Sequence, residues 1–166
     1  MAPRLLNLTP HACHLYLPDG SVTTIAPYVA PGADKAEEAR VPTERRFLGW
    51  RGVTAESTVG ELRIEPADAA GVAALPVGAI ALYTPQVPTG APNLPSRDED
   101  DGETAILVSY MVGEFCAAHQ DSWRGPVYGP DTAPGCAVRS TDEKNKGQII
   151  GVRGLTLFKS ANECTH

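Results

Sequence analysis

The chain has 166 residues, of which 20 are acidic and 14 are Lys or Arg, giving a formal net charge of −6. A single domain of this length buries a substantial core. The acidic balance argues against nucleic-acid binding, which depends on clustered basic residues. No apolar run approaches the roughly 20 residues of a membrane-spanning helix, and the first residues lack the apolar segment of a secretory signal. We therefore expect an intracellular protein without a nucleic-acid or membrane partner.

The composition also favours short strands over long helices. The chain contains 16 glycines and 15 prolines, and this content leaves little room for long helices. The sequence predicts a β-rich α+β fold: one compact domain over residues 1–159, built of short, mostly antiparallel strands with one or two short helices. Residues 160–166 are expected to form a frayed tail. The four cysteines are expected to remain thiols, because the cell interior is reducing.

The first predicted element is a β-hairpin near the amino terminus. Residues 13–26 comprise an extended run (CHLYL), a turn (PDGS) and a β-branched return (VTTIA). Gly20 supplies the freedom to adopt a positive φ in that turn. The following stretch, residues 27–44, mixes prolines, a glycine and charges, which indicates a loop with one short strand near residues 39–41.

The middle of the chain contains further strand-like stretches and one long loop. Strands are predicted within residues 45–53, 58–66 and 77–85, and the last stretch is apolar enough for burial on both faces. Residues 86–103 combine prolines with a block of acids, which is typical of a functional loop or a mobile insertion. The acids at residues 98–103 lack the alternate-position spacing of an EF-hand, so we expect a solvated loop and no calcium site.

One segment carries a clear helix signal. Residues 105–108 indicate a buried strand, Ser109 is a suitable N-cap, and residues 110–119 can form nearly three helical turns. Gly113 weakens that helix by about 1 kcal/mol relative to alanine, so tertiary packing must hold it. Residues 136–158 then predict a closing hairpin and a last strand.

The two ends of the chain together resemble a known family. Residues 7–11 form an Asn-Leu-Thr-Pro-His block that continues into the hairpin, and residues 106–115 read ILVSYMVGEF. With the closing segment 129–155, they resemble small proteins found largely in bacteriophages, prophages and some bacteria. Residues 28–102 depart from that family in length and content. The resemblance implies a fold and a viral setting, but no mechanism.

The start of the predicted helix suggests an anion-binding site. Backbone N–H groups are unpaired there, and the partial positive charge of a helix N-terminus attracts anions. If the sheet brings His11 and Arg139 close to Ser109, these groups form a small pocket for a phosphate-bearing ligand. Thr9 and Asp131 complete the predicted set. We therefore expect a non-catalytic binding protein for a small anionic ligand such as a nucleotide derivative, acting as a viral accessory factor in the host cytoplasm if the family setting holds.

A zinc site is the sharpest chemical alternative. His11, Cys116 and His119 are suitable ligands, and the last two are expected on one helix face at i and i+3. Their spacing matches no structural zinc pattern, and in an extended strand Cys13 and His14 project to opposite sides. No metal ion and no cofactor is therefore predicted.

Two other functions complete the alternatives. Ser109, His11 and Asp131 supply the residue types of a hydrolase, but no nucleophile elbow or other motif surrounds them, and Ser109 is better explained as a helix cap. No catalytic residue is therefore predicted. The second alternative is a viral structural or assembly protein, located in the virion, that self-associates through its acidic surface and its long proline-rich loop.

Overall fold

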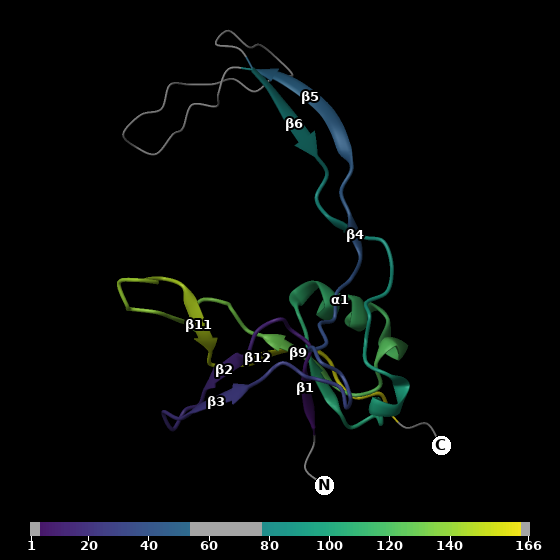
Figure 1. The fold of residues 1–166 in the computed structure, drawn as a ribbon, viewed down its shortest axis with the longest axis vertical. Coiled ribbons are helices and arrows are strands. Elements are labelled where there is room, and N and C mark those ends of the chain that lie inside the picture. Colours follow the sequence, from purple (N-terminus) through teal and green to yellow (C-terminus); the bar gives the residue numbers. More distant parts are fainter. Residues whose placement is uncertain (1–3, 54–77, 164–166) are drawn as a thin grey trace. The chain divides into compact units, whose positions relative to one another are not determined.

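The structure is a computed structural model that describes residues 4–53 and 78–163 (Figure 1). The chain divides into two compact units, Met1–Pro42 together with Gly90–His166, and Thr43–Thr89. The described elements confirm the predicted β-rich α+β class, because short strands dominate, most strand pairs are antiparallel and the helices are few. The prediction of one domain over residues 1–159 stays a prediction.

The first unit contains a four-stranded sheet, here called sheet A. In spatial order its strands are β1 (Leu5–Asn7), β8 (Ala105–Leu107), β9 (Val127–Pro130) and β12 (Leu155–Lys159). The first three run parallel, and β12 is antiparallel to β9. All three residues of β8 are buried, as their apolar run predicts for a strand covered on both faces.

The second sheet of this unit, sheet B, contains both predicted hairpins. Its spatial order is β10 (Ala137–Arg139), β11 (Ile149–Val152), β2 (Cys13–Tyr16) and β3 (Val22–Ile25). The β2–β3 hairpin is confirmed, and Gly20 in its turn has a φ of 88°. The closing β10–β11 hairpin is confirmed as well.

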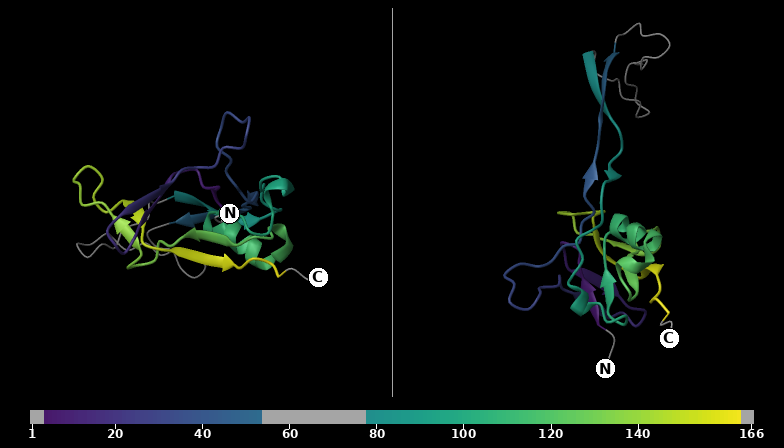
Figure 2. Two further views of the ribbon diagram at one scale, coloured as in Figure 1. Left: turned by 90° about the horizontal axis from the view of Figure 1, so that it is seen from below. Right: turned by 90° about the vertical axis from the view of Figure 1, so that its right-hand side faces the viewer.

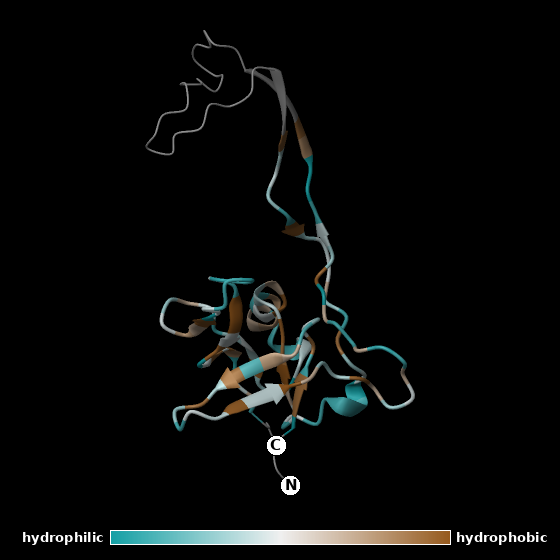
Figure 3. Ribbon diagram, turned by 60° about the vertical axis from the view of Figure 1, so that its left-hand side comes forward, coloured by the Kyte–Doolittle hydropathy of each residue, from teal (hydrophilic) through white to brown (hydrophobic). Residues whose placement is uncertain are grey.

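Sheet A lies between two hydrophobic clusters, because alternate side chains of each strand point to opposite faces. On one face, Ile106 and Val127 pack against Val112 and Cys116 of α1 (Tyr110–Ala118). On the other face, Leu107 packs with the partly buried Tyr128 against Cys13 and Val152 of sheet B. Figures 1 and 2 show the helix and sheet B beside sheet A, and Figure 3 shows hydrophobic stretches in brown among the strands of the first unit.

The strand predicted near residues 39–41 does not form, but the apolar side chains of this segment are buried in the core. Ala39 and Val41 are buried in the same cluster as α1, and the Ala39 N–H donates to the Leu8 carbonyl at 2.9 Å. This segment therefore contributes core packing and one backbone bond without forming a ladder.

Within its described residues, 43–53 and 78–89, the second unit contains two antiparallel ribbons. One pairs β4 (Thr43–Glu44) with β7 (Val87–Pro88), and the other pairs β5 (Phe47–Val53) with β6 (Gly78–Tyr83). The last two confirm strands predicted at 45–53 and 77–85, whereas the stretch 58–66 lies outside the described residues. Tyr83 is 47 % exposed, so this end of β6 is not buried on both faces.

The segment 86–103 has more structure than a plain loop. It contains β7 and the 3-10 turn η1 (Arg97–Glu99), and Asn93 bonds to the backbone of Glu38 and Arg40. Asp100 is buried and accepts the Arg124 N–H at 3.0 Å. The mobility of the segment 86–103 stays a prediction.

The start of the predicted tail also contacts the body of the first unit. Asn162 donates through its backbone N–H to the Arg124 carbonyl and through Nδ2 to the carbonyl of Gln120, in the turn η2 (Gln120–Ser122). Residues 164–166 lie outside the described part of the chain.

Among the described residues, no helix has the length and apolar character needed to cross a membrane.

Gly113 in α1 is explained by the packing of the helix on sheet A. A Cβ at this position would lie 2.3 Å from the Phe158 ring of β12, and a Cβ at Gly129 would lie 2.6 Å from the same ring. Tyr110 stacks edge-on against Phe158, with ring centroids 5.5 Å apart. The Phe158 ring is therefore enclosed by two glycines and a tyrosine, and any added side-chain atom meets it directly.

We predict that Gly113→Ala destabilises the protein although alanine is the better helix former. The propensity gain of about 1 kcal/mol is outweighed by overpacking, which typically costs about 1–3 kcal/mol. Thermal unfolding should show a melting temperature lower by several degrees. Gly154→Ala is the matched control, because a Cβ there meets nothing within 4 Å. A Gly113→Ala protein more stable than wild type would contradict this account of the helix packing.

Candidate functional site

The Asn-Leu-Thr-Pro-His block is organised by the buried side chain of Asn7, at the end of β1. Asn7 is 1 % exposed, and its Nδ2 donates to the carbonyls of His11 and Ile25 at 3.0 and 2.8 Å. Its Oδ1 accepts the backbone N–H and the hydroxyl of Thr9 at 3.0 and 2.6 Å. Every donor and acceptor of this carboxamide is therefore used to shape the turn that leads into β2.

The same turn determines which groups of the block are available to a ligand. The Thr9 hydroxyl lies 2.6 Å from Asn7 Oδ1 and 2.9 Å from the His11 carbonyl, so its single proton is already shared between two acceptors. The His11 side chain is exposed, and its ring makes no hydrogen bond to any described residue. Thr9 is thus chiefly a turn residue, and His11 is the group with unused hydrogen-bonding capacity.

Ser109 occupies the N-cap position of α1, as predicted, but its side chain makes no capping hydrogen bond. The first turn of the helix contains no acidic residue. The positive end of the helix dipole is therefore uncompensated by the helix's own side chains, which is the condition that favours an anion. The helix ends at Ala118, so His119 is a C-cap with a φ of −127° and not part of the helix.

A pocket of about 270 Å³ lies beside this helix start, and three of the five predicted ligand-binding residues line it: Thr9, His11 and Ser109. Its other walls come from β2, β11 and the end of β9. Cys13 and Val152 are buried lining residues, whereas Ile149 and Ile150 are 40 % and 37 % exposed. The pocket thus combines apolar surface with polar groups from the turn and the helix start.

The other two predicted residues are not brought to this pocket. The Arg139 guanidinium donates to the Gly147 carbonyl at 2.6 Å, across the base of the β10–β11 loop. Asp131 Oδ1 accepts the Ala133 N–H at 3.0 Å, and its neighbour Thr132 is the residue that lines the pocket. Both side chains thus have local roles, and their assignment as ligand contacts stays a prediction.

Sequence reasoning missed the apolar walls of the pocket. The sequence predicts only that Ile149, Ile150 and Val152 belong to a closing strand, because nothing in it places that strand beside β2. The pairing is a long-range one, with Val152 opposite Leu15. The available signal was the Ile149–Ile150 pair, which puts large apolar side chains on both faces of a short strand.

The zinc candidates do not converge. Within residues 4–53 and 78–163, no three His, Cys, Asp or Glu side chains form a group that could hold a metal ion. Cys116 is fully buried in the core under α1, where burial raises the pKa of its thiol. The His119 ring stacks on Phe115 with ring centroids 4.1 Å apart. His11 instead lines the 270 Å³ pocket beside the start of α1.

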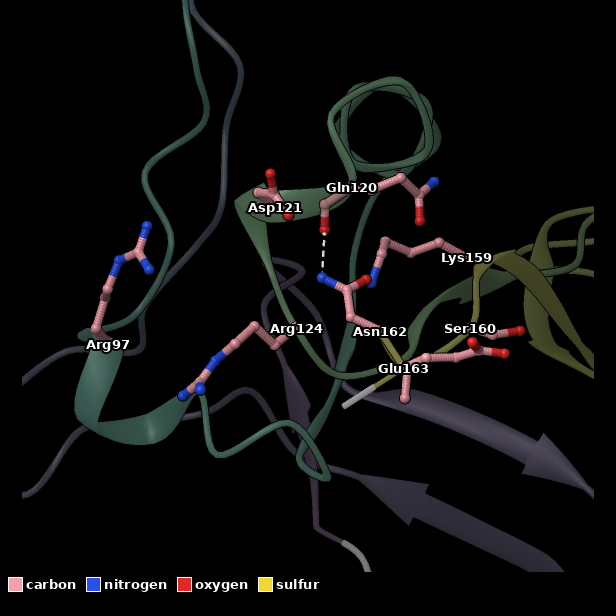
Figure 4. Close-up of a pocket in the computed structure, with 9 residues that line it drawn as sticks. Arg97, Gln120, Asp121, Arg124, Lys159, Ser160, Asn162 and Glu163 are labelled. Carbon is pink, nitrogen blue, oxygen red and sulfur yellow. Dashed lines mark hydrogen bonds between the residues drawn. The ribbon is translucent and has the colours of Figure 1, made fainter. Parts of the chain in front are cut away.

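A larger surface pocket, of about 650 Å³, lies between η2, Arg124 and the end of the chain (Figure 4). Lys159 lines it although the residue is only 4 % exposed, and its Nζ donates to the carbonyls of Trp123 and Gly125 at 2.8 and 3.0 Å. Burial lowers the pKa of this lysine. Sequence reasoning missed Lys159, since only the fold places two backbone carbonyls at its ammonium.

The basic groups of this larger pocket are mostly occupied. Arg124 pairs with Asp100, at 3.6 Å between Nε and Oδ2, and a second nitrogen of its guanidinium bonds to the Asp100 carbonyl. Figure 4 shows Arg97 and Arg124 ending well apart from Lys159. Asp121 adds an acidic group to the lining. The described residues of this pocket therefore provide no set of free, convergent cations for an anionic ligand.

Comparisons of the chain with models of protein families, with curated proteins and with solved structures find no match.

The turn network predicts that Asn7→Ala destabilises the protein by about 2–4 kcal/mol, because the His11 and Ile25 carbonyls lose their donor in a buried setting. Chemical denaturation would measure the change. Asn93→Ala is the matched control: Asn93 also bonds to the backbone through both amide atoms, but it is exposed and water can replace it. Equal losses for the two variants would contradict the role assigned to Asn7.

Proposed function

We propose that the protein is a non-catalytic binding protein for a small anionic ligand, held in the 270 Å³ pocket beside α1. One observation carries the proposal: Thr9, His11 and Ser109 line the same pocket at a helix start without a side-chain cap or an acidic first turn. An anion at that position compensates the helix dipole and accepts hydrogen bonds from N–H groups of the helix start that have no partner among the described residues.

The size of the pocket limits the ligand. Small-molecule pockets generally measure about 300–1,000 Å³, so this one, at about 270 Å³, lies just below the lower end of the range. It fits one ring-sized apolar group with an attached anionic group. A mononucleotide or a fragment of similar size is therefore a better candidate than a dinucleotide.

The chemistry of the lining supports an amphipathic ligand. Ile149 and Ile150 offer apolar surface for a ring, and Ser109 and His11 offer hydrogen-bonding side chains at the rim. Among the described residues, no arginine or lysine lines the pocket, so affinity for the anion depends on oriented N–H groups and the imidazole. A bare inorganic anion would leave the apolar wall unused and should bind weakly.

The arrangement favours binding over catalysis. Among the described residues, no hydrogen bond joins Ser109 to His11 or His14, so a nucleophile is not paired with a base. The His14 Nδ1 instead lies 3.0 Å from the Thr24 hydroxyl. The viral accessory role rests on the family resemblance alone and belongs to the same proposal.

A thermal-shift screen tests the proposal. Adenosine monophosphate, cyclic nucleotides and ADP-ribose should be compared with adenosine and with inorganic phosphate. A probe that binds only the folded state adds about 2.7 kcal/mol at one hundred times its dissociation constant, which shifts a melting curve by several degrees. We expect a mononucleotide to shift the melting temperature more than either of its separate halves, and calorimetry would confirm the hit.

Two variants test the location of the site. His11→Ala should weaken binding of the confirmed probe at least several-fold while leaving the turn intact, because only the His11 carbonyl takes part in the Asn7 network. Lys144→Ala is the matched control and should bind as wild type, since Lys144 is exposed and does not line the pocket. The proposal fails if no anionic probe shifts the wild-type protein, or if His11→Ala binds as tightly as wild type.

A further inference from the structure

The strand β11 contains a β-bulge where it borders the 270 Å³ pocket. Val138 of β10 pairs with Gly151. The next residue along β10, Arg139, pairs with Ile149, so Ile150 is an extra residue on β11. In a regular strand consecutive side chains point to opposite faces, but here both isoleucines line the pocket. The bulge therefore shapes this wall, as bulges beside functional sites often do.

The pairing of β10 with β11 determines the direction of the backbone groups on one side of the bulge. The Arg153 N–H donates to the Cys136 carbonyl at 2.7 Å. In an antiparallel ladder, hydrogen-bonded pairs alternate with non-bonded ones, so Gly151 and Val138 form the next bonded pair. The Gly151 N–H therefore points to β10.

The other side of the bulge gives Ile150 the same direction. The Ser140 N–H donates to the Gln148 carbonyl at 2.8 Å, so the neighbouring pair Arg139–Ile149 is a non-bonded one. Such a pair has a hydrogen bond on each side of it, which directs the Ile150 N–H to β10 as well. In a planar trans peptide the C=O points opposite to the N–H of the following residue. The carbonyls of Ile149 and Ile150 therefore both point away from β10, towards β2.

The strand β2 leaves these two carbonyls available to a ligand. Its ladder with β11 consists of the pair Val152–Leu15, and the pairing stops there, before the bulge (Figure 1). Outside the strand ladders, no donor in the described part of the chain bonds to the carbonyl of Ile149 or Ile150. The bulge thus provides two hydrogen-bond acceptors at the wall of the pocket.

Donors and acceptors therefore come from different walls of the pocket. The N–H groups at the start of α1 attract an anion, whereas the carbonyls at the bulge repel an anion and attract a donor. We infer that the ligand is an amino-substituted pyrimidine nucleotide, with its phosphate at the helix start and its exocyclic amino group donating to the bulge carbonyls. This inference rests on the proposed function. A volume of about 270 Å³ favours one ring over the two rings of a purine.

Calorimetric titration with cytidine monophosphate and uridine monophosphate tests the inference. The two compounds share the phosphate, the sugar and the ring size, and they differ in an amino donor that is replaced by a carbonyl acceptor. We expect cytidine monophosphate to bind at least about tenfold more tightly, because uridine monophosphate directs an acceptor at two acceptors. Two methylated forms are matched controls. Cytidine monophosphate with a dimethylated amino group has no donor and should bind weakly, whereas 5-methylcytidine monophosphate keeps the donor and should bind like the parent compound.

A chain from which Ile150 is deleted tests the role of the bulge. Without the extra residue the regular alternation returns, and the two neighbouring carbonyls no longer point the same way. The ratio of the affinities for cytidine and uridine monophosphate should fall towards one. Ile150→Val is the matched control, because it keeps the extra residue and should keep the ratio. Circular dichroism and melting curves would verify that both chains fold, and a ratio measured on one preparation does not depend on its folded fraction.

The outcomes separate this inference from the proposed function. Equal binding of the two nucleotides, or tighter binding of uridine monophosphate, overturns the inference and leaves the anion pocket in place. A folded deletion chain that discriminates as well as wild type also overturns it, because the bulge carbonyls would then not recognise the amino group. If the deletion chain does not fold, the two methylated nucleotides decide. If no nucleotide binds, the inference and the proposed function both fail.

Discussion

The first unit depends on one buried carboxamide, that of Asn7. Its four hydrogen bonds join the end of β1 to the turn at Thr9 and to the carbonyls of His11 and Ile25. Sheet A and sheet B are thereby connected at the point where the chain passes from one to the other. Because a buried amide with unmade bonds costs about 1–3 kcal/mol for each group, the turn has one strongly favoured geometry. That geometry presents the His11 side chain outward and directs Cys13 into the core.

The second constraint is the close approach of α1 to sheet A. Gly113 and Gly129 leave room for the Phe158 ring, and the helix rests on this ring despite a low intrinsic propensity. The position of the helix start, and hence of Ser109, is therefore fixed by packing at the middle of the helix and not by a side-chain cap. A helix held in this way can leave its first turn free for a ligand, since its stability does not depend on a local capping bond.

The parts of the fold that the sequence predicted are those determined locally. The hairpin around Gly20, the strand–serine–helix segment and the closing hairpin follow from turn chemistry and apolar runs, and the structure confirms them. The site was predictable only in part. His11 and Ser109 line one pocket, but Arg139 is engaged by the Gly147 carbonyl, an acceptor that no sequence pattern reveals. The apolar wall likewise depends on the pairing of β11 with β2, across more than a hundred residues.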